Sequence, residues 1–301
     1  MNKSAAIIGL GVLGSAIAEY LLKSDFEIHG FDISLEALSK FDSFENFHSC
    51  SSISDIFLTQ ENILLCLPSP ANLDAVMQAI PSQKDLNKIA DSNVPLVIEL
   101  STLPVDAKQN ALTLARDKQI RMVDSPVSGN RIVALQGKLS AYLSGNEEDV
   151  RAAKPVLEAF CQKVTEVGAF GNGSKMKLIG NILNLVHNSI TAEVMVLGMK
   201  VGLEPELIYQ AISGTFSSSA VFEGRGQLMV QNDYAVEGMN FSTPIKDSDF
   251  ITKLAKDNFV PLPIYQVALQ YYLAAMAQGY QDMDAAAVCA VIEKNANLSR
   301  Q

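Results

Sequence analysis

A glycine-rich turn near the start of the chain constrains its fold more than any other feature. An apolar run over Ser4–Ile8 leads into this turn, and a helical pattern follows over Val12–Lys23. In a strand–turn–helix unit with Gly-x-Gly-x-x-Gly, the first glycine permits the tight turn. The second lets a pyrophosphate approach the backbone, and the third lets helix and strand pack closely. The free N–H groups at the helix N-terminus can then bind the pyrophosphate. The spacing favours a dinucleotide-binding unit over an ordinary surface turn. The motif consists of Gly9, Leu10, Gly11, Val12, Leu13 and Gly14.

A carboxylate follows the next apolar run. Glu27–Phe31 has the pattern of a second strand, and Asp32 comes directly after it, about twenty residues beyond the glycines. At this place a carboxylate can accept hydrogen bonds from both ribose hydroxyls of a dinucleotide. It would repel the 2′-phosphate of NADP, and no arginine stands in Ile33–Lys40 to reverse that preference. The sequence therefore predicts NAD as the cofactor rather than NADP.

Strand-like and helical patterns alternate over the first half of the chain, and helical patterns alone follow. This alternation is typical of right-handed βαβ units and a doubly wound, mainly parallel sheet. We expect an α/β fold with an N-terminal Rossmann domain at residues 1–168 and an all-α C-terminal domain at residues 169–301, joined by a long interdomain helix. The expected strands are Ser4–Ile8, Glu27–Phe31, Asn62–Leu67, Pro95–Leu100, Ile120–Val123, Leu139–Leu143 and Lys163–Val167. The expected helices are Val12–Lys23, Ala71–Ala79, Val105–Lys118, Glu148–Phe160, Ser174–Val201, Pro205–Ser213, Ala220–Val230, Lys246–Asn258, Pro263–Gln278 and Met283–Asn295.

Composition and charge exclude several classes of partner. The net charge is −10, and the sequence contains no cluster of lysine and arginine. We therefore expect no nucleic-acid partner. No run approaches the roughly 20 apolar residues of a membrane span, so we expect no membrane partner. The four cysteines have no metal or redox spacing and indicate reduced thiols in a cytoplasmic protein. The three histidines are scattered along the sequence, so no metal site is expected.

The longest expected helix, Ser174–Val201, carries a narrow polar stripe on an otherwise apolar surface. A stripe of this kind faces either solvent or a wet cleft. Asparagine is a poor filler for an exposed helix face but suits the positioning of a small polar ligand. A lysine in a partly apolar cleft is a usable general acid or base near neutral pH. The stripe consists of Lys177, Asn181, Asn184, Asn188 and Thr191.

Several motifs in the same order along the chain resemble the β-hydroxyacid dehydrogenase family, which includes 3-hydroxyisobutyrate dehydrogenase and tartronate semialdehyde reductase. The resemblance spans essentially the whole chain. The motifs that carry it are Gly9 to Gly14, Asp124-Ser125-Pro126-Val127-Ser128-Gly129, Gly171-Asn172-Gly173 with Lys177 and Asn181, Lys246-Asp247, and Asp282 through Ala285.

The resemblance implies NAD-dependent interconversion of a small β-hydroxy acid and its semialdehyde. Lys177 would exchange a proton with the substrate oxygen while hydride passes between the same carbon and the nicotinamide. Ser128 and the Gly129 N–H would hold the substrate carboxylate, and Asn181 would orient the substrate or Lys177. Lys246 would approach both nicotinamide and substrate. The remaining cofactor contacts implied by the family are Leu67, Pro68, Thr102 and Asp247.

The chain departs from the family pattern just after Gly129. Asn130 replaces a second glycine, and Val133 stands where a later glycine is expected. One hypothesis is that Arg131 or Asn130 meets a second polar group on the substrate. The alternative is that Arg131 is a surface residue paired with a nearby carboxylate.

Two other functions stay open at this point. An imine reductase on the same scaffold is one, although Lys177 disfavours it because imine-reducing relatives typically carry a different residue there. A non-catalytic dinucleotide-binding protein is the other, although a sensor has no need of a lysine and an asparagine aimed into a cleft. The apolar C-terminal helices, such as Pro263–Gln278, predict a homodimer or homotetramer.

Overall fold

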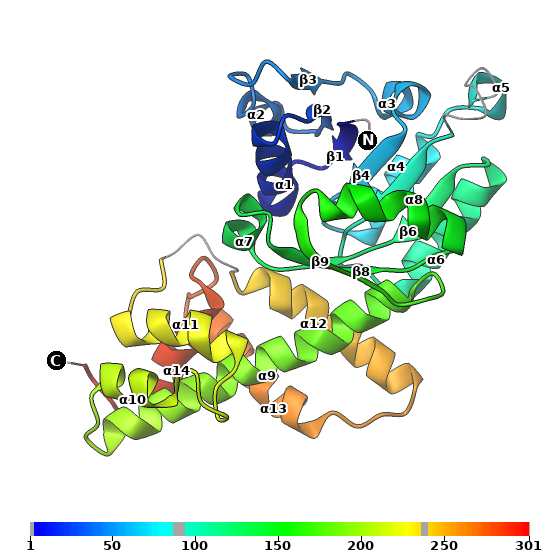
Figure 1. Ribbon diagram of the computed structural model, residues 1–301. Coiled ribbons are helices and arrows are strands. Elements are labelled where there is room, and N and C mark those ends of the chain that lie inside the picture. Colours follow the sequence, from blue (N-terminus) through cyan, green and yellow to red (C-terminus); the bar gives the residue numbers. More distant parts are fainter. Residues whose placement is uncertain (1–2, 87–93, 236–239, 301) are drawn as a thin grey trace. The chain divides into compact units, whose positions relative to one another are not determined.

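The computed structural model describes residues 3–86, 94–235 and 240–300. The chain forms two compact units, Met1–Lys177 and Leu178–Gln301 (Figure 1). The first unit contains the sheets, and the second contains helices only, apart from one isolated bridge between Asn240 and Asp284 among its described residues.

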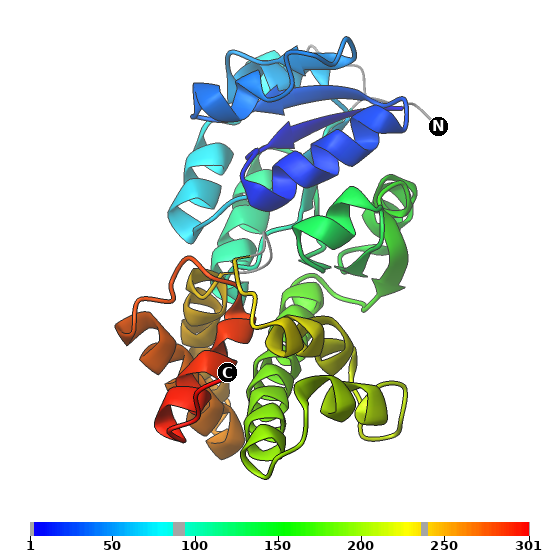
Figure 2. The same ribbon diagram turned by 90° about the vertical axis from the view of Figure 1, so that its left-hand side faces the viewer.

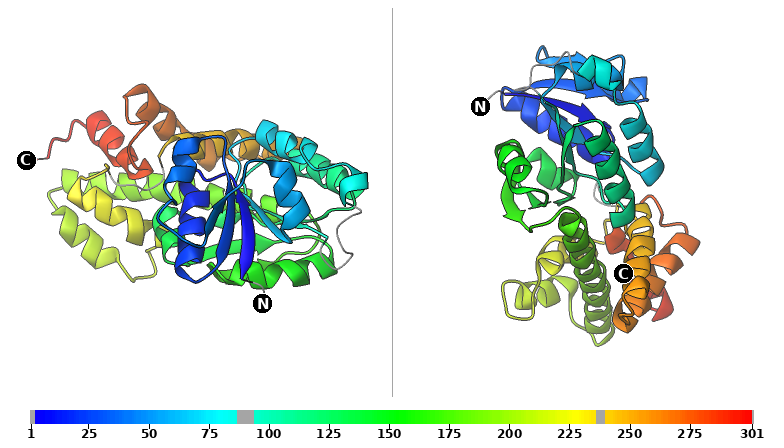
Figure 3. Two further views of the ribbon diagram at one scale, coloured as in Figure 1. Left: turned by 90° about the horizontal axis from the view of Figure 1, so that it is seen from above. Right: turned by 90° about the vertical axis from the view of Figure 1, so that its right-hand side faces the viewer.

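A six-stranded parallel sheet forms the centre of the first unit. Its strand order is β3-β2-β1-β4-β5-β6, so the order reverses between β1 and β4 (Figure 3). This is the doubly wound arrangement that the sequence predicts, and its ligand-binding point lies where the order reverses. The strands are β1 (Ser4–Ile8), β2 (Glu27–Phe31), β3 (Phe47–Ser49), β4 (Asn62–Leu65), β5 (Leu96–Glu99) and β6 (Arg121–Asp124).

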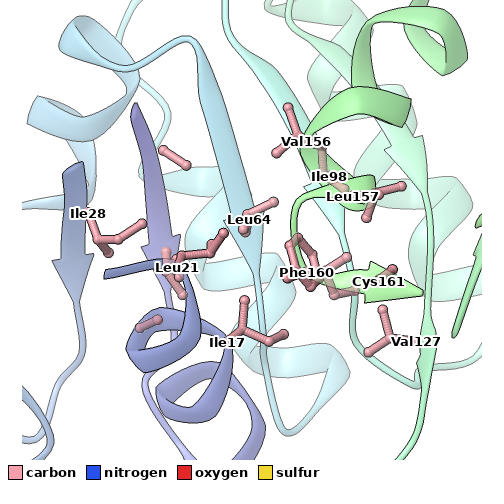
Figure 4. Close-up of a cluster of buried hydrophobic side chains, with 14 of the residues drawn as sticks. Ile17, Leu21, Ile28, Leu64, Ile98, Val127, Val156, Leu157, Phe160 and Cys161 are labelled. Atoms are coloured by element: carbon pink, nitrogen blue, oxygen red, sulfur yellow. The ribbon is translucent and has the colours of Figure 1, made fainter. Parts of the chain in front are cut away.

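Both faces of this sheet are buried, as expected for parallel strands. Alternate residues of β1 belong to different cores, since Ile7 packs in one hydrophobic cluster and Ile8 in the other. The side chains of one cluster, including Ile17 and Leu21 of α1 and Leu64 of β4, point toward one another (Figure 4). The helices of this unit that accompany the sheet are α1 (Val12–Lys23), α2 (Leu35–Ser39), α3 (Ile53–Thr59), α4 (Pro70–Gln78), α5 (Gln83–Leu86), α6 (Val105–Asp117) and α8 (Glu147–Glu158).

The last two expected strands do not extend this sheet. They are β8 (Leu139–Leu143) and β9 (Cys161–Glu166), which form a separate three-stranded sheet with β7 (Val127–Ser128). The chain continues from β6 into β7 in the same direction. Asp124 at the end of β6 forms an antiparallel bridge with Ser144, and β7 pairs antiparallel to β8. The expectation that these two strands belong to the doubly wound sheet is wrong, because the chain reverses between β7 and β8, and β8 then pairs with β7 and β9. The short helix α7 (Arg131–Leu135) connects β7 to β8 and packs against α1.

The second unit is helical, as predicted. Its core gathers the buried faces of several helices around Tyr265, Tyr272 and Phe241. The long helix α9 (Asn172–Lys200) begins in the first unit and continues through the second (Figure 2). The other helices are α10 (Pro205–Ile212), α11 (Ala220–Gln231), α12 (Ser242–Asp257), α13 (Pro263–Ala277), the 3-10 helix η2 (Ala285–Ala287) and α14 (Val288–Asn295).

Among the described helices, α9 is the one long and apolar enough to cross a membrane by length and composition. The expectation that no segment approaches a span is therefore too strong. Leu178, Leu185, Ala192 and Met195 of α9 belong to the hydrophobic core of the second unit. A core helix of a soluble protein passes the same test, and these core contacts are typical of one.

Candidate active site

The three glycines after β1 differ in what surrounds them. Gly9 has a φ of +96°, and a Cβ there would collide with the Cys66 carbonyl at the end of β4. A Cβ on Gly14 would collide with the carbonyl oxygen of Gly9, so only glycine lets α1 pack this closely on the turn. Gly11 instead faces open space, with no atom within 4 Å of its Cβ position. This open position suits the close approach of a pyrophosphate.

The N-terminus of α1 is available to an anion. Gly11 occupies the N-cap, no side chain caps the helix, and no acidic residue lies in its first turn. The first N–H groups of a helix have no intrahelical partner and carry partial positive charge. Val12 in the first turn is 67% exposed. The structure of this turn therefore fits the phosphates of a dinucleotide.

Asp32 ties the end of β2 to the glycine turn. Its Oδ2 accepts a hydrogen bond from the Leu10 N–H at 2.7 Å, and its Oδ1 accepts one from the Ser34 N–H at 2.8 Å. Each oxygen keeps a further lone pair for a ribose hydroxyl. Ile33 beside it is 88% exposed and offers an apolar surface next to this carboxylate.

Two further loops leave the same edge of the sheet. Leu67 and Pro68 follow β4, and the Leu67 N–H donates to the Ser101 hydroxyl at 2.8 Å. Ser101 and Thr102 follow β5, so this hydrogen bond joins the two loops. The predicted cofactor residues of the first unit thus all follow the carboxyl ends of β1, β2, β4 and β5, where ligands bind in open α/β sheets.

A buried polar network fixes the start of α9, and sequence reasoning missed it. Asp124, at the end of β6, accepts hydrogen bonds from the Ser174 N–H and the Ser174 hydroxyl, both at 2.8 Å. The Gly173 N–H donates to the Ser144 hydroxyl, which donates in turn to Asp124. Lys177 lies one helical turn beyond Ser174 and is half-buried. The network therefore anchors the turn that carries Lys177.

The charge of Asp124 is balanced by a buried lysine. Lys108 of α6 is fully buried, and its ammonium lies 2.8 Å from Asp124 Oδ1 and forms a second ion pair with Glu99. Burial alone would lower the pKa of Lys108, but the carboxylates of Asp124 and Glu99 outweigh burial and raise it. Burial raises the pKa of Glu99, and Lys108 opposes that shift. The only sequence signal was a lysine at an apolar position of a helix, which spacing alone does not distinguish from a surface residue.

The predicted substrate segment begins at β7. Ser128 is half-buried, and Gly129 has a φ of +136°, a conformation that favours glycine. Asn130 caps α7, since its Oδ1 accepts a hydrogen bond from the Val133 N–H at 3.0 Å. Val133 packs against the core of the first unit. Arg131 is half-buried in the first turn of α7. Asn130 and Val133, which stand where the family pattern has glycines, are therefore part of a capped helix.

A second cluster of predicted site residues lies in the helical unit. Asn181 Nδ2 donates to Asp247 Oδ2 at 2.7 Å, and Asn184 Nδ2 donates to Asn181 Oδ1 at 3.3 Å. Lys246 Nζ lies 3.4 Å from Asp247 Oδ1 and 5.6 Å from the centre of the Phe250 ring. Asp247 is 3% exposed, so its carboxylate lies beneath the two side chains that it orients.

The expectation that the polar stripe on α9 faces solvent or a wet cleft is wrong for its second half. Asn188 is fully buried, and its Nδ2 donates to the Tyr272 hydroxyl at 2.7 Å and to the Ala285 carbonyl at 2.9 Å. The Thr191 hydroxyl donates to the His187 carbonyl. These groups satisfy buried polar atoms within the second unit, which is why they occupy an otherwise apolar helix.

The strand order, the three glycines and the uncapped helix are typical of a dinucleotide-binding protein. Residues 4–168 match the family described as the NAD binding domain of 6-phosphogluconate dehydrogenase. Residues 171–292 match the family described as NAD-binding of NADP-dependent 3-hydroxyisobutyrate dehydrogenase. The chain belongs to the β-hydroxyacid dehydrogenase family, as its motifs indicate.

Similar proteins include several hydroxyacid dehydrogenases. L-threonate dehydrogenase of Cupriavidus necator is 29% identical over 292 residues, which cover 96% of this chain and 95% of that protein. 2-(Hydroxymethyl)glutarate dehydrogenase of Eubacterium barkeri is 26% identical over 99% of this chain and 98% of its own. The crystal structure of 3-hydroxyisobutyrate dehydrogenase from Salmonella typhimurium has a TM-score of 0.81 at 24% identity, covering 96% of this chain and 99% of that one. The protein is therefore an NAD(P)-dependent hydroxyacid dehydrogenase.

Imine reductases share the fold at a greater distance. The imine reductase of Pseudomonas sp. has a TM-score of 0.55 at 16% identity, covering 96% of this chain and 99% of that one. This difference favours the dehydrogenase assignment over the imine reductase alternative.

Proposed function

We propose that this protein interconverts a small β-hydroxy acid and its semialdehyde with NAD, using Lys177 as general acid and base. One observation carries the proposal. The carboxylate of Asp124 holds the first turn of α9, and Ser128 follows Asp124 closely in the chain. Asp124 thus joins the segment that carries Ser128 to the start of α9, which carries Lys177. Both residues belong to the same compact unit as the glycine turn.

The chemistry assigned to these residues is proton transfer and charge stabilisation. In the oxidation direction, the Lys177 amine accepts the proton of the substrate hydroxyl; in reduction, its ammonium returns that proton to the same oxygen. When bound, the nicotinamide accepts or supplies the hydride at the carbon that bears this oxygen. The ammonium also stabilises negative charge on the oxygen, more strongly in a half-buried position than in water. Ser128 and the Gly129 N–H hold the substrate carboxylate.

The helical unit supplies positioned polar groups to this proposal. Asp247 holds Asn181 through a hydrogen bond and Lys246 through an ion pair. We assign Asn181 and Lys246 to contacts with substrate and nicotinamide, as the family resemblance implies. Asp247 then acts through them as a positioning residue rather than as a cofactor ligand.

The preference for NAD is proposed from Asp32. Two backbone N–H groups hold its carboxylate at the end of β2, so it cannot easily turn away from a 2′-phosphate. The exposed Ile33 supplies an apolar surface for the adenine ring. In an Asp32→Ser variant, we expect the ratio of kcat/KM for NAD to that for NADP to fall at least about tenfold, a difference of about 1.4 kcal/mol.

We propose a small carboxylate substrate with a second polar group near Arg131. Asn130 uses its Oδ1 to cap α7, and Arg131 follows it in the first turn of this helix, so we assign the role to Arg131. The match to a dehydrogenase named for a dicarboxylate supports testing this class. Arg131→Ala should reduce activity on dicarboxylates more than on monocarboxylates. An equal loss on both would mean that Arg131 has a structural role alone.

Assembly and location also belong to this proposal. Several apolar side chains of α13 are exposed in the single chain, among them Ile264, Val267 and Leu273. We propose that a homodimer or homotetramer covers them in the cytoplasm. A monomeric mass by light scattering would exclude this assembly.

The decisive experiment compares two lysines of the same helix. Reduction of NAD+ at 340 nm would be measured against 3-hydroxyisobutyrate, glycerate, 3-hydroxypropionate, 4-hydroxybutyrate, threonate and 2-(hydroxymethyl)glutarate. Lys177→Ala should lower kcat by about 10²–10⁴-fold. Lys175→Ala is the matched control, because Lys175 is exposed two residues earlier on α9, and it should leave activity unchanged.

Equal activity in the two variants would remove Lys177 from the mechanism. No activity on any substrate, with NADH binding intact by fluorescence, would favour the imine reductase or the non-catalytic dinucleotide-binding alternative. Turnover of a cyclic imine would then distinguish these two.

A further inference from the structure

Two of the three histidines, scattered in the sequence, meet on one face of the main sheet. His29 of β2 is paired in register with His48 of β3, so both side chains leave the sheet on the same side. Their ring centres are 4.9 Å apart. Glu27 lies two residues before His29 on β2 and therefore shares this face. Within the described residues, these form the one group of three potential ligands, with one atom from each lying within 4.8 Å of the others.

The strands that carry these side chains are held in place from the opposite face. The Phe47 ring packs over Gly30, where a Cβ would collide with it, and it stacks on Phe41 with ring centres 4.7 Å apart. Hydrogen bonds continue along both strands, from the Ile28 N–H to Asn46 and from the Cys50 N–H to Gly30. The register of β3 against β2 is therefore determined by a packed core, and the ligand positions do not depend on a loop.

We propose that Glu27, His29 and His48 bind a divalent cation of borderline softness, with Zn²⁺ as the probe. Two imidazoles and one carboxylate are a ligand set that Zn²⁺ commonly takes, with water in the fourth position. At Zn–N distances of about 2.0–2.1 Å, tetrahedral ligand atoms lie about 3.3 Å apart. Rotation of the exposed Glu27 and His48 side chains can close the present separation. This site is independent of the proposed dehydrogenase chemistry.

The surroundings of His29 suit metal binding. Partial burial, together with the neighbouring His48, lowers the pKa of His29, so its ring is neutral and able to coordinate at neutral pH. The carboxylate of Glu27 opposes this shift and supplies the negative charge of the site. A bound cation would cross-link the edge strand β3 to β2, outside the glycine turn and the loops that bind the dinucleotide.

The composition of the chain makes the test direct. The protein contains three histidines, so its histidine ring spectrum by NMR contains three sets of signals. One equivalent of Zn²⁺ added to the full-length protein should shift the signals of His29 and His48 and leave those of His187 unchanged. By calorimetry, His48→Asn should weaken Zn²⁺ binding at least about tenfold, because even residues outside the ligand shell are worth 10–100-fold in metal affinity.

Two variants control for other ligands. His187→Asn removes the remaining histidine, and Cys50→Ser removes the thiol nearest to β3 in the chain; both should bind Zn²⁺ like the wild type. NADH binding should be the same in every variant, which shows that each is folded. The proposal is overturned if one equivalent of Zn²⁺ shifts no histidine signal or shifts all three, or if His48→Asn binds like the wild type.

Discussion

Replacing Lys108 with methionine tests the buried network that anchors α9. The Lys108 ammonium is fully buried and donates to the Ser101 carbonyl at 2.6 Å and to Asp124 Oδ1 at 2.8 Å, besides its ion pair with Glu99. Methionine approximates the volume of the side chain but removes the charge. Lys108→Met therefore leaves two carboxylates buried without a counter-ion, and one of them, Asp124, holds Ser174 at the start of α9.

The size of the effect follows from this geometry. Breaking a buried ion pair by removing one partner costs about 3–5 kcal/mol, because the remaining charge stays desolvated. Here the cost is limited by protonation of Glu99, whose pKa burial already raises. Loss of Lys108 raises that pKa further, since the ammonium lowers it in the wild type. We therefore expect a loss of about 3–5 kcal/mol near pH 8.

The loss should depend on pH in a defined direction. A carboxyl group with a folded pKa above its unfolded value destabilises the fold once the pH exceeds the unfolded value, which is 4.5 for Glu99. The cost of Lys108→Met should therefore shrink as the pH falls from 8 toward 4.5. In the wild type, the raised pKa of Lys108 contributes stability that is present below pH 10.5 and is lost above it.

The assay is urea unfolding followed by circular dichroism at pH 8 and pH 5. Lys138→Met, at an exposed site, is the control and should change stability by no more than about 0.5 kcal/mol. Adding Glu99→Gln to Lys108→Met should recover part of the loss, because it removes one buried charge and keeps the acceptor for the Ser101 N–H. A loss below about 1 kcal/mol, or one independent of pH, would refute the reasoning.

Three further outcomes follow from contacts in the two units. Gly11→Ala should unfold like the wild type, because a Cβ there meets open space, yet it should bind NADH weakly when binding is followed by fluorescence. Gly14→Ala should lower the unfolding midpoint, because a Cβ there meets the backbone of Gly9. Asp247→Asn should lower kcat by about 10–100-fold in steady-state assays, because Asn181 and Lys246 both lose the carboxylate that positions them. An unchanged kcat would contradict this role. Hydrogen bonds from two serines and one backbone N–H lower the pKa of Glu223 to about 2, so the stability that it contributes above pH 4.5 should be lost as the pH falls toward 2. Glu223→Gln should weaken the pH dependence of the thermal unfolding midpoint over that range. The same pH dependence in the variant and the wild type would contradict this contribution of Glu223.

Local patterns were sufficient to predict most elements of the first unit. The run Ser4–Ile8 and the helix Val12–Lys23 match the structure to the residue, because apolar periodicity and glycine spacing act over a few neighbours. The strand β3 was missed because three residues give too short a pattern. The pairing of β8 with β7 was missed because a strand pattern does not specify its partner.

Part of the candidate site could also be predicted from the sequence. Residue types and spacing identified Asp32, Lys177 and Asn181 as candidates, because their chemistry is visible in the side chain. The role of Asp124 was not visible, since it arises from contacts with Ser174, far along the chain. Conversely, Asn188 looked like a ligand contact and instead satisfies buried polar groups.

The sequence alone determined the strand–turn–helix unit, the carboxylate after the second strand and the helical character of the second half. These features depend on backbone sterics and on short hydrophobic periods, which neighbouring residues carry. Tertiary structure decided which polar groups meet: Asp124 with Lys108 and Ser174, Asn181 with Asp247, and His29 with His48. A hydrophobic period indicates which face of an element is buried but not what packs against it. Strand register and helix packing therefore had to bring these distant residues together.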